Sequence, residues 1–160
     1  MILHRHQDLE GASPAPGLFR IIAMDQHLGS GAITQGMVTI EPGRQSRPHT
    51  HRVEESMTLL EGRLRVLIGT EVAEVDAPAT FLAPANTVHS LRNVGATPAV
   101  LCIAYPSVNV GTYFVDGIEY ERGRRPGSRE LDGRRGKRNP ARLPGWGTGP
   151  DPQEALIRPS

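Results

Sequence analysis

Turn-forming residues recur at short intervals between residues 18 and 105, and this spacing constrains the fold more than any other feature of the chain. The intervening segments are short and rich in residues that favour β-strands. No helical periodicity is sustained before residue 150, so the pattern predicts an all-β protein, an antiparallel sandwich or barrel. We expect strands over residues 17–24, 32–40, 48–53, 56–60, 63–68, 72–75, 79–82, 88–93 and 99–105.

Charge and composition divide the 160 residues into two unlike parts. Residues 1–120 contain eight basic and twelve acidic residues, a balance of −4, whereas residues 121–160 contain ten and five, a balance of +5. The last forty residues also hold seven glycines and six prolines, a composition that cannot bury much apolar surface. We therefore expect an N-terminal arm over residues 1–17, one β-domain over residues 18–120 and an extended basic tail over residues 121–160.

Several classes of protein are disfavoured by the composition. No apolar run approaches the roughly 20 residues of a membrane helix, and the N-terminus has no signal-like apolar stretch, so a cytoplasmic protein is expected. The basic tail can contact nucleic acid, but no aromatic platform accompanies it, and a solvated tail is the favoured interpretation. Cys102 is the only cysteine, so no intrachain disulfide forms, and its apolar surroundings predict a small buried core residue.

The segment from Gly43 to Gly62 carries a pattern typical of a metal site. His49 and His51 are two residues apart, so in an extended strand both imidazoles point to the same side. Glu55 follows four residues later with the same parity. Two imidazoles and a carboxylate that meet inside a β-structure predict a site for a divalent metal ion, and His89 offers a third imidazole.

These residues resemble the two sequence motifs of the cupin superfamily. Every fixed position of the first motif is present in this chain: Gly43, His49, His51, Glu55 and Gly62. Residues 84–93 match the second motif around His89 and Asn93, but Pro78 and Asn86 stand where glycine is usual. Asparagine tolerates left-handed backbone better than other non-glycine residues, so Asn86 is expected to form the same turn.

The resemblance implies a fold, a ligand set and an assembly. It implies a jelly-roll β-barrel in which His49, His51, Glu55 and His89 bind one divalent transition metal. Fe, Mn, Ni, Cu and Zn are all used by similar proteins, and Fe or Mn is favoured here. Resemblance to other cupins also implies a homodimer. Four protein ligands in an octahedral shell leave two positions for a small-molecule substrate, or for substrate and dioxygen.

Three functions are compatible with such a site. The leading hypothesis is a cupin-type dioxygenase, an oxidoreductase that acts on a small organic molecule, with Glu55 as the catalytic carboxylate that adjusts charge and takes a proton. A redox-neutral isomerase or polyketide-cyclase-like enzyme would use the metal as a Lewis acid. A non-catalytic metal-binding or ligand-binding module is the third possibility.

Other residues near the motifs receive simpler interpretations. Arg47 precedes a proline and is expected to be solvated. Tyr105, Tyr113 and Asp116 lie at or after the last expected strand, where they can cap the mouth of the barrel. Inward parity predicts core packing for four apolar side chains, namely Met57, Leu59, Phe81 and Leu91.

Overall fold

The computed structural model describes residues 1–116, so the tail expected over residues 121–160 lies outside the described residues. The described part contains one short 3₁₀ helix, η1 (His6–Asp8), and none of its helices has the length and hydropathy of a membrane span. The strands are β1 (Gly11–Ala15), β2 (Leu18–Met24), β3 (Thr34–Ile40), β4 (His49–Thr50), β5 (Glu55–Glu61), β6 (Arg63–Ile68), β7 (Glu71–Asp76), β8 (Ala79–Ala83), β9 (His89–Asn93), β10 (Ala99–Tyr105) and β11 (Tyr113–Phe114).

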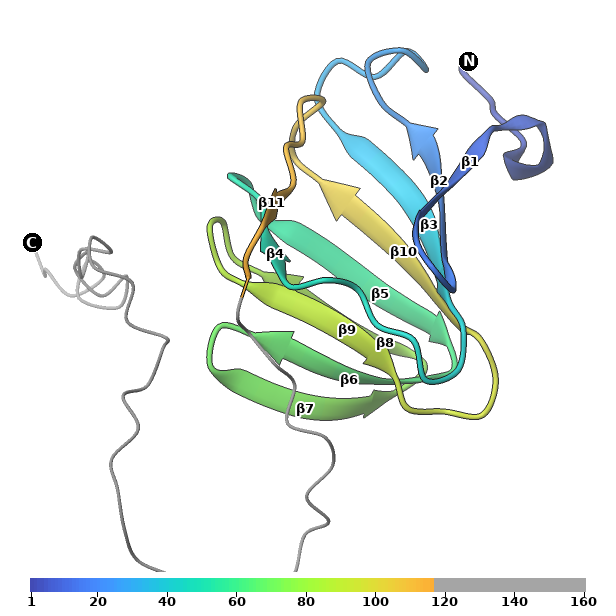
Figure 1. Cartoon of the computed structure of the whole chain (residues 1–160). Coiled ribbons are helices and arrows are strands. Elements are labelled where there is room, and N and C mark those ends of the chain that lie inside the picture. Colours follow the sequence, from blue (N-terminus) through green and yellow to red (C-terminus); the bar gives the residue numbers. More distant parts are fainter. Residues whose placement is uncertain (117–160) are drawn as a thin grey trace, which may run out of the picture. The chain divides into compact units, whose positions relative to one another are not determined.

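The strands form two antiparallel sheets that face each other as the layers of a sandwich (Figure 1). The six-stranded sheet has the order β1-β2-β3-β10-β5-β8, and the five-stranded sheet has the order β11-β4-β9-β6-β7. The all-β prediction is therefore confirmed. No ladder joins the two sheets within the described residues, so the expected barrel is not closed by hydrogen bonds.

The predicted strand boundaries agree best with the observed ones where the strands end in sharp turns. The segments 63–68 and 99–105 coincide with β6 and β10, whereas β4 contains only two residues of the predicted segment 48–53. Two strands were not predicted: β11, and β1, which lies in the expected arm and pairs with β2. Both are edge strands that lack the pattern of a buried strand, because β1 contains only Gly, Ala, Ser and Pro, and β11 has only two residues, both exposed.

Strict alternation along β10 shows how the core is built. Ala99, Leu101, Ile103 and Tyr105 are buried, and the residues between them are half-buried on the outer face. The expectation of a buried Cys102 was wrong, because its parity places it on the outer face, where its Sγ atom accepts a hydrogen bond from Gln35. The inward prediction is confirmed for the buried side chains Met57, Leu59 and Leu91.

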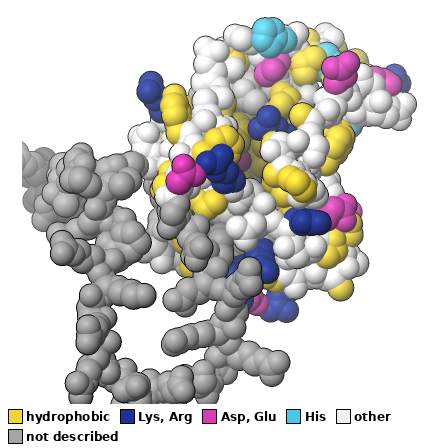
Figure 2. All heavy atoms as spheres, in the orientation of Figure 1, with side chains coloured by type: hydrophobic (Ala, Val, Ile, Leu, Met, Phe, Trp, Pro, Cys, Tyr) yellow, Lys and Arg dark blue, Asp and Glu magenta, His cyan; other side chains and the backbone are white. Residues whose placement is uncertain are grey.

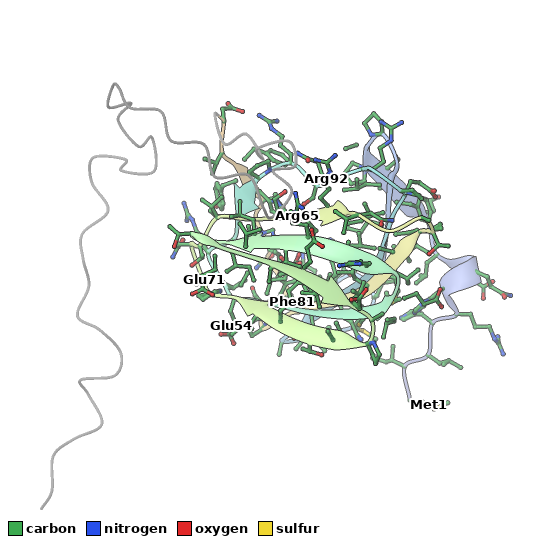
Figure 3. The ribbon with its side chains drawn as sticks, turned by 90° about the horizontal axis from the view of Figure 1, so that it is seen from below. Met1, Glu54, Arg65, Glu71, Phe81 and Arg92 are labelled. Carbon is green, nitrogen blue, oxygen red and sulfur yellow. The ribbon has the colours of Figure 1, made fainter. Side chains whose placement is uncertain are left out.

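β7 and β8 form free edges that belong to different sheets (Figure 3 labels Glu71 on β7 and Phe81 on β8). A cavity of about 570 Å³ lies there, lined by side chains that include Val66, Val72 and Phe81. Phe81 also packs against the core, as expected from its parity. On the face seen in Figure 2, basic and acidic side chains are interspersed among hydrophobic ones.

Left-handed backbone shapes several turns, among them those at Asn86 and Gly62. Asn86 has φ 61°, which confirms that asparagine forms the turn of the second motif. Gly62 has φ 89° between β5 and β6, and a Cβ atom there would lie 2.8 Å from the Cα atom of Ala99. Only glycine fits this turn, because any side chain would collide with the neighbouring backbone.

Asn93 joins the two sheets through its buried side chain. Its Nδ2 atom donates hydrogen bonds to the carbonyl oxygens of Ile40 and Thr97, both at 2.8 Å. Its Oδ1 atom accepts a hydrogen bond from the backbone N–H of Gly95 at 2.8 Å. Ile40 belongs to the six-stranded sheet and Asn93 to the five-stranded sheet, so this amide fixes their separation at one end.

We expect Asn93→Ala to lower the free energy of unfolding by about 2–4 kcal/mol, because it removes three hydrogen bonds and leaves buried carbonyls without a donor. Urea denaturation followed by circular dichroism measures this change. Asn109→Ala is the matched control at an exposed position and should shift stability by less than about 0.5 kcal/mol. Equal stabilities of the two variants would contradict a structural role for Asn93.

Candidate metal centre

The four residues of the predicted site meet between the two sheets. His49 on β4 lies directly opposite His89 on β9, and both belong to the five-stranded sheet. His51 follows β4, and Glu55 begins β5 in the six-stranded sheet. One nitrogen or oxygen atom from each side chain lies within 4.8 Å of all the others. The structure thus brings together the whole set that the motifs predicted.

Glu55 reaches this point by a different route from the one that parity suggested. The expectation was that Glu55, which has the same parity as His49 and His51, faces the same way as these two imidazoles. Instead the chain bends at residues 52–53 and crosses to the opposing sheet. The four residues from His51 to Glu55 therefore carry the chain from one sheet to the other. The carboxylate of Glu55 faces the imidazoles across the sandwich.

Backbone carbonyls hold all three imidazoles in one tautomer. A carbonyl oxygen only accepts hydrogen bonds, so a ring nitrogen bonded to it must carry the hydrogen. This leaves Nε2 of each ring with a free lone pair and fixes the orientation of the ring. The Nδ1 atoms donate as follows: His49 to Arg47 at 2.6 Å, His51 to Gly111 at 2.8 Å and His89 to Thr87 at 2.9 Å.

Tyr105 orients the carboxylate. Its hydroxyl donates a hydrogen bond of 2.6 Å to Oε1 of Glu55, which is only 4% exposed. The other oxygen, Oε2, lies 2.9 Å from Nε2 of His89 and 3.4 Å from Nε2 of His51. The carboxylate therefore presents Oε2 to the point that the imidazole nitrogens face.

Two of these atoms have no hydrogen-bond partner although they are buried. Oε2 of Glu55 and Nε2 of His89 both lack one, despite their separation of 2.9 Å. In the tautomer fixed by Thr87, both atoms present lone pairs, which repel unless a cation lies between them. Three imidazole nitrogens and one carboxylate oxygen form a donor set that suits first-row divalent ions. The residues present therefore fit a metal ion.

The surroundings keep Glu55 ionised. Burial raises the pKa of its carboxyl, but the adjacent imidazoles of His51 and His89 and the hydrogen bond from Tyr105 outweigh burial and lower this pKa to about 2. Burial and the negative charge of Glu55 raise the pKa of Tyr105, which stays a protonated donor. An ionised Glu55 is a good ligand and a weak base, so its role as proton acceptor stays a prediction.

The imidazoles differ in their affinity for protons. Burial, followed by the positive charge that His89 can carry, lowers the pKa of His49 to about 4, so His49 is neutral at neutral pH. Burial also lowers the pKa of His51, but the adjacent carboxylate of Glu55, which stabilises the protonated ring, and the carbonyl of Gly111 outweigh it, and the net shift is upward. A proton on His51 thus competes with a metal ion.

The segment after β10 runs along β4 beside the site. β11 pairs with β4, and the N–H of Val115 donates to the carbonyl of Pro48 at 3.0 Å. Arg47 is exposed as expected, pairs with Asp116 and stacks on Phe114 with its guanidinium carbon 4.6 Å from the ring centroid. Of the three residues predicted to cap the site, Tyr105 contacts the ligands, whereas Tyr113 and Asp116 are exposed.

Sequence reasoning missed the partners that orient the ligands. The acceptors of the three Nδ1 hydrogens are backbone carbonyls, which carry no residue-type signal. Tyr105 had a weak signal, because its inward parity on β10 could have placed it opposite Glu55 on the neighbouring β5.

Comparison with known proteins agrees with this geometry. The sequence profile of the cupin domain matches residues 36–105, a segment that contains all four ligand candidates. The chain belongs to the cupin superfamily. Germin-like protein 3-5 of Oryza sativa subsp. japonica is 34% identical over 92 residues, which cover 52% of this chain and 40% of that protein. The chain spans less than half the length of the curated relatives it matches.

Solved structures share the fold. The polyketide cyclase RemF from Streptomyces resistomycificus is 17% identical, with a TM-score of 0.63, and the match covers 74% of this chain and 88% of that one. An oxalate oxidase is 26% identical, with a TM-score of 0.61, over 71% of this cupin and 63% of that chain. The two antiparallel sheets are therefore those of a cupin.

Tyr105→Phe should weaken binding of a divalent metal about 10- to 100-fold, because the carboxylate of Glu55 loses the donor that orients it. Competition with a chromophoric chelator measures the change. Tyr113→Phe is the matched control, since Tyr113 is exposed and its hydroxyl contacts none of the ligands. Unchanged affinity in Tyr105→Phe would rule out this orienting role.

Metal affinity should rise with pH through the raised pKa of His51 and level off above it. Below that pKa the ion must displace a proton, so affinity should fall up to about tenfold per pH unit. The same chelator competition between about pH 5.5 and 8 measures the slope. Calorimetry in buffers of different ionisation enthalpy counts the released proton, and a flat profile with no proton release would contradict the prediction.

Proposed function

We propose that this cupin is a mononuclear metal-dependent enzyme that acts on a small organic molecule. His49, His51, Glu55 and His89 would hold one divalent first-row ion, with Fe or Mn favoured over Zn, Ni and Cu. The observation that carries the proposal is the pair of buried, unpartnered lone pairs on Glu55 and His89. Nothing in an apolar core requires this arrangement, whereas a cation resolves it.

The reaction we propose is oxidation of the substrate with dioxygen, by a cupin-type dioxygenase or a related oxidase. Identity of 26% to an oxalate oxidase over 71% of the chain supports oxidative chemistry. A redox-active ion at this site would supply both Lewis acidity and electron exchange with dioxygen. The bound substrate would be a small molecule with two neighbouring oxygen atoms.

The residues of the chain would hold and screen the reacting groups. The three Nδ1 hydrogen bonds keep the imidazoles aimed at one point without further reorganisation. Tyr105 holds Glu55 in place, and the ionised carboxylate offsets one of the two positive charges of the ion. His49 is the only half-buried member of the four, so a substrate would enter from its side.

Further expectations belong to the same proposal. The crossed strand order of the two sheets supports a jelly-roll topology over residues 18–120. A cytoplasmic homodimer follows from the resemblance and from the composition. The basic tail over residues 121–160 would be solvated rather than bound to nucleic acid.

Elemental analysis of the purified protein, with oxygen consumption, tests the function. We expect about one Fe or Mn per chain in the wild type and at least a 100-fold weaker affinity in His51→Ala, which removes one ligand. His27→Ala is the matched control, because His27 is exposed and lies outside the site. Oxygen electrodes then follow consumption with oxalate, diketones and catechols.

The outcomes separate the candidate functions. Fe or Mn with substrate-dependent oxygen uptake supports the oxidase. Bound Zn without oxygen uptake favours the redox-neutral isomerase or cyclase. Metal bound without turnover of any compound favours a binding module, and stoichiometric metal in His51→Ala would count against the ligand set itself.

A further inference from the structure

The side chain of Arg20 on β2 projects from the inner face of the six-stranded sheet. It lies directly opposite Val38 on β3, which packs on the core, and Val38 lies opposite the fully buried Leu101 on β10. Residues opposite each other in an antiparallel ladder share one face. The neighbour Phe19 has the other parity and is 47% exposed. Arg20 therefore carries its positive charge on the core face, where arginine is rarely found.

This cation has no counter-charge in the described part of the chain. Arg47 pairs with Asp116, and Arg65 pairs with Glu74, but no carboxylate of residues 1–116 lies within ion-pair distance of Arg20. Arg20 is half-buried, and its side-chain nitrogens are not among the fully buried polar atoms that lack a hydrogen-bond partner. Solvent therefore reaches the guanidinium. A partly desolvated charge without a partner costs free energy and is typical of a binding site.

Arg20 faces the same interior as the metal centre. Tyr105 and His51 contact each other there, and both contact Glu55. Tyr105 projects from the same inner face, four residues beyond Leu101 on β10. The guanidinium and the ligand cluster therefore lie along one wall of the sandwich interior.

We propose that Arg20 binds a carboxylate of the substrate and so selects small organic acids. The inference rests on the proposed metal enzyme and names the class of its substrate. A divalent ion and Arg20 together carry three positive charges, and Glu55 supplies one negative charge, which leaves the site strongly cationic. A guanidinium binds a carboxylate through two parallel hydrogen bonds, which adds orientation to charge.

Calorimetric titration of the Mn²⁺-loaded protein with 2-hydroxy acids tests the inference. Lactate offers one hydroxy-carboxylate group to the metal, whereas malate, 2-hydroxyglutarate and 2-hydroxyadipate add a second carboxylate at increasing reach. We expect at least one of these diacids to bind tenfold or more tightly than lactate. Arg20→Gln should abolish this preference and leave lactate unchanged, and Arg20→Lys should retain part of it.

Arg47→Gln is the matched control, because Arg47 is exposed and already paired with Asp116, and it should keep the preference. Arg20→Gln should also melt no lower than the wild type, since it removes an unpartnered charge. Equal binding of all four acids by the wild type, or a preference that survives in Arg20→Gln, would overturn the role of Arg20 while leaving the metal site intact. Failure to bind Mn²⁺ would overturn the proposed function and this inference with it.

Discussion

A carboxylate buried opposite three imidazoles is the constraint on which this structure depends. Glu55 is ionised and almost inaccessible to solvent, which costs several kcal/mol unless its charge is compensated. Tyr105 satisfies one oxygen, but the other faces nitrogens whose hydrogens point away from it. The site is therefore complementary to a cation, and a bound ion would link the stability of the fold to the proposed function.

The position of this site explains why the sandwich needs ties at both ends of β9. His89 begins β9 and faces Glu55 of the opposing sheet, so an ion there would join the sheets. Asn93 ends β9 and bonds the carbonyl of Ile40 on the opposing sheet. Between these ends apolar side chains of the two sheets pack on each other, and the β7–β8 side stays open. Metal binding should therefore add to folding stability by mass action.

Arg20 is the residue through which charge bears on the proposed substrate. On the outer face, Arg63 and Arg65 pair with Glu74. Arg20 differs from them, because it faces inward and lacks an ion-pair partner in the described residues. An unbalanced inward cation is a weakness for folding, and in the role we propose it would be an advantage for binding an organic acid. Natural sites often combine these two properties.

The sequence alone determined the fold class, the boundaries of β6 and β10 and the four residues that meet at the candidate site, because turn residues and motif spacing are local features. It did not determine that Glu55 arrives from the opposing sheet, that carbonyls fix the imidazole tautomers, or that Arg20 faces the interior that holds the site. These depend on strand register and on crossings between segments far apart in the chain. Only long-range pairing decides them, and it leaves no residue-type signal in any single segment.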